Sequence, residues 1–164
     1  MALPNKVLPG FSAALYAQPT ASPTVLTLAQ LSLVASVSPI AVIGNLVPVE
    51  AIPAFGQDDA VASFTVAGSR QSDKIPAQSA PTSMTITAAW NPSDAVLLLI
   101  RGDAYSGIVD RTYVIAASDG ANIVYYAFNA RASQFQIDAA PGAEAKCMFT
   151  IHPRGNLYGW SNNA

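Results

Sequence analysis

Two segments of alternating residues meet at Asp119-Gly120, and this junction constrains the fold more than any other feature of the chain. Arg111–Ser118 and Asn122–Ile137 are rich in β-branched and aromatic residues. An Asp-Gly pair between two such segments favours a tight β-turn, because both residues tolerate the positive φ that the turn requires. The pattern predicts an antiparallel hairpin. A third strand, Ala143–His152, follows a turn at Ala139–Gly142.

Further strands are predicted upstream of this hairpin at Phe11–Gln18, Ile40–Ile52 with a bend at Pro48, Ala60–Gly68 and Thr82–Trp90. In the last of these, alternation places Met84, Ile86, Ala88 and Trp90 on one face and Ser83, Thr85, Thr87 and Ala89 on the other. Ser69–Pro81 reads as a long polar loop between two strands. Val25–Val37 fits either a strand or a short helix, and the pattern does not decide between them.

One helix is predicted. Asn91 suits an N-cap, Pro92 the first helical position and Asp94 the first turn, before the apolar run Ala95–Ile100. Gly102 is expected to end it, so that Arg101-Gly102-Asp103 lies at the helix C-terminus rather than serving as an adhesion motif.

The order of elements, strands and then one helix and then strands, predicts a mainly β (α+β) fold. We expect a β-sandwich or barrel with one short flanking helix. Seven prolines between Pro4 and Pro53 argue against long helices in that part of the chain. The expected organisation is an N-terminal arm or extension at 1–38 and one β domain at 39–164.

The scarcity of charge suggests that much of the surface is covered by other molecules. Only 11% of the 164 residues are charged and 51% are hydrophobic, whereas about 25% charged is usual. A domain of this size that carries so few charges exposes broad apolar or small-residue patches, and such patches mark partner surfaces. The composition favours self-association. The alternative is a soluble domain kept in solution by Ser, Thr and Asn.

The charge pattern argues against nucleic-acid and membrane binding. The net charge is −2 and the basic residues are scattered, so no basic patch is expected to hold nucleic acid. The stretch Val7–Val49 has no charged residue, and Thr24–Val47 is long enough to cross a bilayer. Its internal Gln, Ser, Pro, Gly and Asn residues argue against a membrane span, and Met1–Gly10 does not resemble a signal peptide.

No combination of side chains points to catalysis, a cofactor or a metal. His152 is the sole histidine and is expected at a strand end, and Cys147 is expected to be a buried thiol. Asp58-Asp59 could bind a hard cation, but a solvated turn that faces a partner or a channel is favoured. The aromatic residues Tyr125, Tyr126 and Phe128 are expected to pack inside the protein rather than stack on bases.

Residues Ile40–Arg154 resemble the tail tube proteins of long-tailed bacteriophages. Three features carry the resemblance: Val42-Ile43-Gly44-Asn45-Leu46 followed by Ile52-Pro53-Ala54-Phe55-Gly56; the strand from Ser83 that runs into Trp90-Asn91-Pro92 and a short helix; and the C-terminal meander with its Asp119-Gly120 turn. The first forty residues, in which Lys6 is the one charged residue, differ from the short start typical of this family.

The resemblance implies a β-sandwich or barrel subunit, six of which form a ring and contribute strands to a continuous barrel around a lumen. It also implies that the loop Ser69–Pro81, with Arg70, Gln71, Asp73 and Lys74, touches the neighbouring ring. A lumen that passes DNA should lack cations, which would hold phosphates. The uncharged faces Ser63/Thr65/Ala67 and Ser83/Thr85/Thr87/Ala89 are therefore expected to line it.

The expected function is that of a non-enzymatic phage tail tube subunit, located in the virion tail and assembled in the cytoplasm of the bacterial host. Its expected partners are copies of itself, a terminator, a baseplate or tip and a tape measure protein, with genomic DNA passing transiently and without sequence-specific binding. Three alternatives remain: the tube of a contractile injection or secretion machine, a capsid decoration protein, and a small-ligand-binding β-barrel such as a lipocalin-like carrier.

Overall fold

The computed structural model describes residues 12–22, 24, 26–27, 29–31, 45–64, 73–118 and 122–163. The elements are β1 (Ser12–Ser22), β2 (Asn45–Val47), β3 (Val49–Ala51), β4 (Gln57–Phe64), β5 (Asp73–Pro81), β6 (Met84–Ala89), α3 (Ala95–Ser106), β7 (Asp110–Ser118), β8 (Ile123–Asp138) and β9 (Lys146–Asn163). The prediction of a mainly β fold with one short helix is confirmed.

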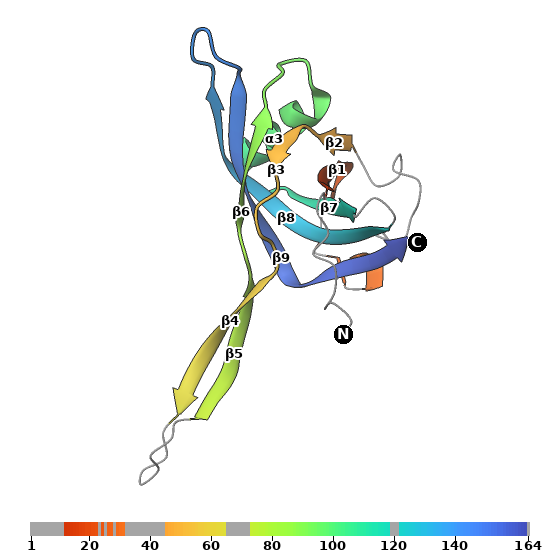
Figure 1. Cartoon of the computed structure of the whole chain (residues 1–164), viewed down its shortest axis with the longest axis vertical. Coiled ribbons are helices and arrows are strands. Elements are labelled where there is room, and N and C mark those ends of the chain that lie inside the picture. The colour runs from red at the N-terminus through yellow and green to blue at the C-terminus, as the bar shows by residue number, and fades with distance from the viewer. Residues whose placement is uncertain are drawn as a thin grey trace, which may run out of the picture.

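Seven strands form one antiparallel sheet in the order β2-β1-β7-β8-β9-β6-β3. The two outermost strands, β2 and β3, are separated in the chain only by Pro48. The sheet must therefore curl until its two ends meet, which gives a half-barrel body (Figure 1). The predicted bend at Pro48 is confirmed, because β2 pairs with β1 whereas β3 pairs with β6.

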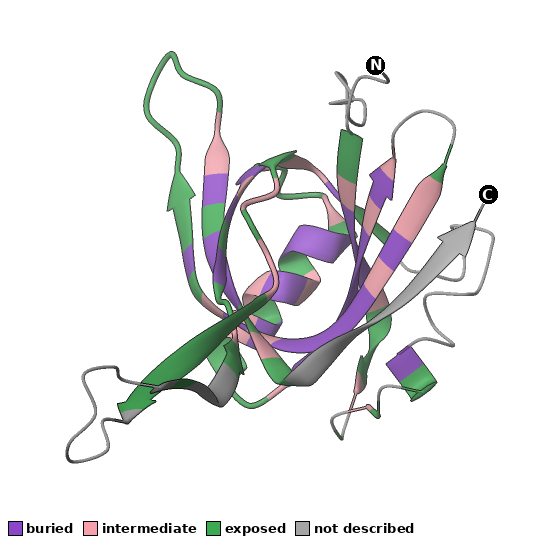
Figure 2. Ribbon diagram, turned by 60° about the horizontal axis from the view of Figure 1, so that its bottom comes forward, coloured by how far each residue is buried: buried purple, intermediate pink, exposed green. Residues whose placement is uncertain are grey.

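The core lies inside the curl, and α3 fills it (Figure 2). Alternation in β6 buries Met84, Ile86 and Ala88 and leaves Thr85 exposed, as predicted. Leu97 and Ile100 of α3 are fully buried against the inner faces of the strands. Deeper aromatic packing is supplied by Tyr113 and Phe128, whose stacked rings lie 6.0 Å apart between centroids.

The limits predicted for α3 are wrong at both ends. Asp94 is the N-cap, and its carboxylate accepts from the Val96 and Leu97 amides, while Asn91 instead closes the preceding turn through Ser93. The helix passes through Gly102 and ends at Gly107, which has φ 67°. Arg101-Gly102-Asp103 therefore lies inside the helix, and Asp103 is buried.

A second apolar cluster covers the outer face of β1, β7 and β8. Tyr16, Val114 and Tyr125 lie there beneath Leu31, and the Leu26 amide donates to Asn129 Oδ1 at 2.7 Å. Residues 29–31 form a helical turn, so the helical interpretation holds at these positions and the rest of Val25–Val37 is largely outside the described residues. Within the predicted extension 1–38, β1 is a strand of the body, between β2 and β7.

A two-stranded arm, β4 and β5, projects from the body (Figure 1). It continues the β3–β6 ladder, and the Thr82 amide donates to the Gly56 carbonyl at 3.0 Å where the arm begins. The prediction that Ser69–Pro81 is a loop is wrong for residues 73–81, which are strand β5. Asp58 and Asp59 were expected in a turn, but they lie within β4.

The hairpin predicted around Asp119-Gly120 is confirmed by the pairing of β7 with β8, in which Ser118 lies opposite Ile123; the turn residues themselves are outside the described residues. The last strand is longer than predicted, because β9 continues past His152 to Asn163. Pairing of β6 with β9 ends at Met84 and Ile151. Beyond that point no described strand is hydrogen-bonded to this edge of β9, so Pro153, which lacks an amide proton, is tolerated.

Candidate assembly surfaces

One half of the outer side of the sheet is an open polar face. We call it the polar face and define it by the outward side chains of β6, the first half of β9 and the second half of β8. Because Met84, Ile86, Phe149 and Ile151 point into the core, alternation turns the residues between them outward. These outward residues are Thr85, Thr87, Ala89, Met148, Thr150, His152, Ser133 and Gln136, with Ser83 just before β6.

Hydrogen bonds cross this face from strand to strand. His152 contacts Ser83 Oγ through Nδ1 at 2.9 Å and Ser133 Oγ through Nε2 at 2.7 Å. One row further along, Thr150 Oγ1 lies 3.2 Å from Thr85 Oγ1 and donates to Gln134 Oε1 at 3.1 Å. The face is therefore built mainly of neutral hydroxyl and amide groups, with Met148 and Ala89 as its apolar members.

Charges lie at the ends of the polar face rather than along its middle. At one end, Lys146 pairs with Glu50 of β3, and the hydrogen bond to Glu50 is the main cause that raises the pKa of Lys146. At the other end, Asp110 binds Arg131 at 3.0 Å and Arg154 at 2.6 Å. Each of these basic groups thus has an acidic partner within the same chain, although Arg131 and Arg154 share the one carboxylate of Asp110.

The polar face carries the sole histidine of the chain, His152. Both nitrogens of His152 contact serine hydroxyls rather than carboxylates. The described residues contain no group of three or more His, Cys, Asp and Glu that could hold a metal ion. Cys147 is buried as predicted, and burial raises the pKa of its thiol. No helix in the described part of the chain has the length and apolarity to cross a membrane.

The strands that carry the polar face leave two sheet edges unpaired within the described residues. At one side, β3 pairs only with β6. At the other side, pairing of β7 with β8 ends at Arg111 and Ala130, so β8 from Ala132 to Asp138 pairs only with β9. Unpaired edges are templates for strands of another chain.

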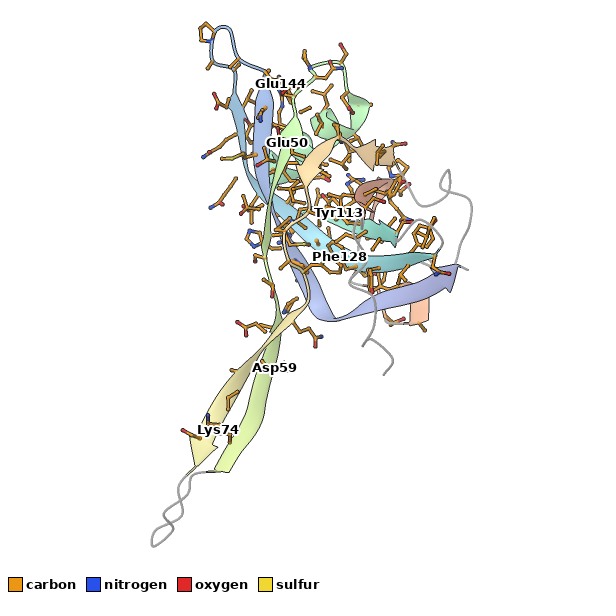
Figure 3. All side chains as sticks on the ribbon, viewed as in Figure 1. Glu50, Asp59, Lys74, Tyr113, Phe128 and Glu144 are labelled. Carbon is orange, nitrogen blue, oxygen red and sulfur yellow. The ribbon has the colours of Figure 1, made fainter. Side chains whose placement is uncertain are left out.

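The arm is a third surface without a core of its own. Every described side chain of β4 from Gln57 to Ser63 is exposed, and Val61 is 60% exposed. Figure 3 shows Asp59 and Lys74 on the arm, whereas Glu50 and Glu144 lie at the opposite end of the molecule. An isolated two-stranded hairpin is only marginally stable in water, so the arm is suited to a contact with another molecule.

The predicted site residues are divided between the body and the arm. Ser83, Thr85 and Thr87 lie together on the polar face, with Ser83 and Thr85 exposed and Thr87 half-buried. Ser63 lies on the arm, as do Asp73 and exposed Lys74 of β5. Thr65, Arg70 and Gln71 are outside the described residues. The contribution of β9 and β8 to the polar face was not predicted, although apolar residues at alternate positions from Ala143 to Ile151 place Met148 and Thr150 on the opposite face of that strand.

The fold is that of tail tube and tube terminator proteins. The solved structures that resemble this chain include the sheath/tube terminator of the PVC extracellular contractile injection system, with TM-score 0.65, 11% identity, 99% of this chain and 100% of that chain covered. The tube-terminating cap of the anti-feeding prophage has a TM-score of 0.62 at 13% identity, and the alignment covers 100% of this chain and 95% of that chain. The SPP1 tail tube has a TM-score of 0.55 at 13% identity, and the alignment covers 91% of this chain and 77% of that chain. No protein-family model and no curated protein matches the sequence.

Proposed function

We propose that this chain is a structural, non-enzymatic subunit of a phage tail tube, and that six copies form a ring around a lumen lined by the polar face. The observation that carries the proposal is the combination of that uncharged face with two unpaired edges on its flanking strands, β3 and β8. A ring satisfies both edges at once, because each copy offers one edge to each neighbour.

Strand direction supports such a ring. The pairings of β3 with β6, β6 with β9 and β9 with β8 are all antiparallel, so β3 and β8 run in opposite directions. Rotation about an axis along the strands preserves their direction. The β8 edge of one copy and the β3 edge of the next are therefore antiparallel, and four strands per copy continue around a closed barrel without a mismatch.

The chemistry of the polar face supports passage of a polyanion. Ser83, Thr85 and Thr87 offer no cation to hold phosphates, and the basic side chains at the ends of the face are paired with acidic ones. The arm prolongs the β3–β6 ladder, so we propose that Ser63 and Thr65 continue the lumen surface along the tube axis. Genomic DNA is the proposed transient occupant of the lumen, without sequence-specific binding.

We further propose that the arm, including Arg70, Gln71, Asp73 and Lys74, reaches the neighbouring ring. Exposure of every side chain from Gln57 to Ser63 supports this, because β4 buries neither of its faces within the protomer. The remaining proposed partners are a terminator, a baseplate or tip and a tape measure protein. The proposed location is the virion tail, after assembly in the cytoplasm of the host.

A second candidate is a tube-end piece, a ring that terminates a tube instead of extending it. This candidate is supported by the PVC terminator structure, which aligns with 99% of this chain over 100% of its own length and has a higher TM-score than the SPP1 tail tube. A lipocalin-like carrier is disfavoured because α3 and its core partners occupy the interior of the curled sheet.

Sedimentation velocity over a range of protein concentrations separates these functions. A tube subunit is expected to pass from the 17.0 kDa protomer to rings and then to particles of increasing length. A tube-end piece is expected to stop at one ring size. A protomer that stays at 17.0 kDa at the highest concentration, with no ring in electron micrographs, would overturn the proposal.

A further inference from the structure

The outward face of α3 is apolar although it is open to solvent. Leu98 is 40% exposed and Tyr105 is 71% exposed, and Ile108, just after the helix, is 76% exposed. Helical spacing places Leu98, Gly102 and Tyr105 on one side of the helix. We call these three residues with Ile108 the α3 outer face.

Gly102 in the middle of this face has no explanation within the protomer. A glycine inside a helix is about 1 kcal/mol less favourable than alanine. A Cβ at Gly102 would meet nothing within 4 Å, and the backbone there has no positive φ. Neither crowding nor backbone conformation therefore requires glycine. What glycine does provide is a notch between Leu98 and Tyr105 into which another chain can approach the helix closely.

The α3 outer face borders the unpaired edge of β8. The helix packs chiefly against β8. Directly after the helix, the Ile108 carbonyl accepts from Arg131 Nη2 at 3.2 Å, and Arg131 lies where pairing of β8 with β7 has just ended. A chain that pairs with the free edge of β8 is thus brought alongside α3.

We propose that the α3 outer face receives β2 of a second copy of this chain, with the Leu46 side chain seated near Gly102. The proposal rests on the proposed ring, in which β3 of one copy pairs with β8 of the next. Because only Pro48 separates β3 from β2, that pairing carries β2 toward the neighbour's α3. Leu46 on β2 is 57% exposed, so each side of the contact offers apolar surface that the protomer leaves uncovered.

The two sides of this contact are different surfaces of the same chain. Such a head-to-tail contact generates a closed ring or a helical filament rather than a two-fold dimer. It also supplies apolar burial behind the strand pairing, which the backbone hydrogen bonds between β3 and β8 do not supply themselves.

Substitution of Gly102 separates folding from assembly. Gly102→Ala is expected to raise the melting temperature of the dilute protomer by roughly 2–4 °C, because it removes the cost of a helical glycine. Gly102→Gln is expected to leave the protomer folded and to raise the concentration needed for ring formation by at least about tenfold, because the long side chain fills the notch. Rings that form at the wild-type concentration with Gly102→Gln would overturn the proposal.

A cross-link tests the identity of the occupant. In the double variant Leu46→Cys and Tyr105→Cys, mild oxidation of assembled protein should give a ladder of disulfide-linked multimers on a non-reducing gel, whereas each single variant should not. Assembled rings that yield no ladder would contradict the contact between β2 and α3 while leaving the ring itself standing. Wild-type protein that forms no rings at all would instead contradict the proposed function.

Discussion

The Asp103 carboxylate of α3 accepts two hydrogen bonds from the Arg111 guanidinium of β7. Nε donates to Oδ2 at 2.5 Å and Nη2 donates to Oδ1 at 3.0 Å. Both side chains are almost fully buried. Arg111 Nη1 also donates to the carbonyls of Gln18 and Pro19, where the register of β1 shifts. Arg111 thus links α3, which lies inside the curled sheet, to strands β7 and β1.

Removal of one partner of this pair should destabilise the protomer strongly. Asp103→Ala leaves the Arg111 charge buried without a counter-charge, and we expect a loss of about 3–5 kcal/mol in the free energy of unfolding, measured by urea denaturation. The matched control is Lys146→Ala, which removes an exposed pair with Glu50 and should leave the urea midpoint close to that of the wild type. Equal effects of the two changes would refute the anchoring role.

Tyr113→Phe should stabilise the protomer and change its response to alkali. The Tyr113 hydroxyl has no hydrogen-bond partner among the described residues, so its removal should add about 1–2 kcal/mol to the free energy of unfolding at pH 8.

Burial, and then the Asp103 charge, raise the pKa of Tyr113 above its ordinary value. The unfolded chain ionises near pH 10 while the folded chain keeps the proton. Wild-type stability should therefore be intact below pH 10 and decline above it. Urea midpoints between pH 8 and 11 measure this, and the difference between wild type and Tyr113→Phe should widen with pH; a constant difference would contradict the assignment.

Much of the body could be predicted from the sequence, because its signals are local. The alternation from Met84 to Ala89 and the turn signal at Asp119-Gly120 are each carried by a few neighbouring residues, so no distant contact is needed to recognise them. The end of α3 could not be predicted, because the helix continues past Gly102 to place Asp103 against Arg111, a partner on another element. The continuation of β9 past Pro153 likewise depends on where β6 stops pairing.

For the polar face, the sequence predicts which residues of one strand share a side, but not which strands lie next to one another. Alternation gave Ser83, Thr85 and Thr87, but nothing local shows that β6 lies beside β9 and that Thr150 and Ser133 share its surface. Of the arm, the predicted strand Ala60–Gly68 overlaps β4, whereas β5 was missed. Lys74 to Pro81 contain two prolines and few apolar residues and read as loop, yet pairing with β4 holds them extended.

Replacement of the arm should separate ring formation from stacking. Because the Thr82 amide already donates to the Gly56 carbonyl, Gln57–Pro81 can be replaced by Asn-Gly, which closes a tight turn. The shortened protomer should keep its urea midpoint, since the described β4 side chains add no buried core, and should form rings that do not stack. Stacked tubes of normal length in electron micrographs would contradict the role of the arm.

A cation on the polar face should slow the passage of DNA. Thr85→Arg places one positive charge per copy on the proposed lumen wall, and we expect ejection of DNA from assembled virions to slow by roughly tenfold or more, less so at high salt. Thr85→Gln controls for side-chain size without charge. If the two variants eject DNA at the same rate, Thr85 does not face the DNA.

A cryo-electron microscopy reconstruction of the particles formed by the purified protein tests the central claim most directly. The account predicts a ring whose inner wall consists of β3, β6, β9 and the second half of β8, with Thr85, Thr150 and Ser133 facing the lumen and β8 of each copy paired with β3 of the next. A ring whose lumen is lined by α3 or by the β1–β7 side, with the polar face on the outside, would contradict it.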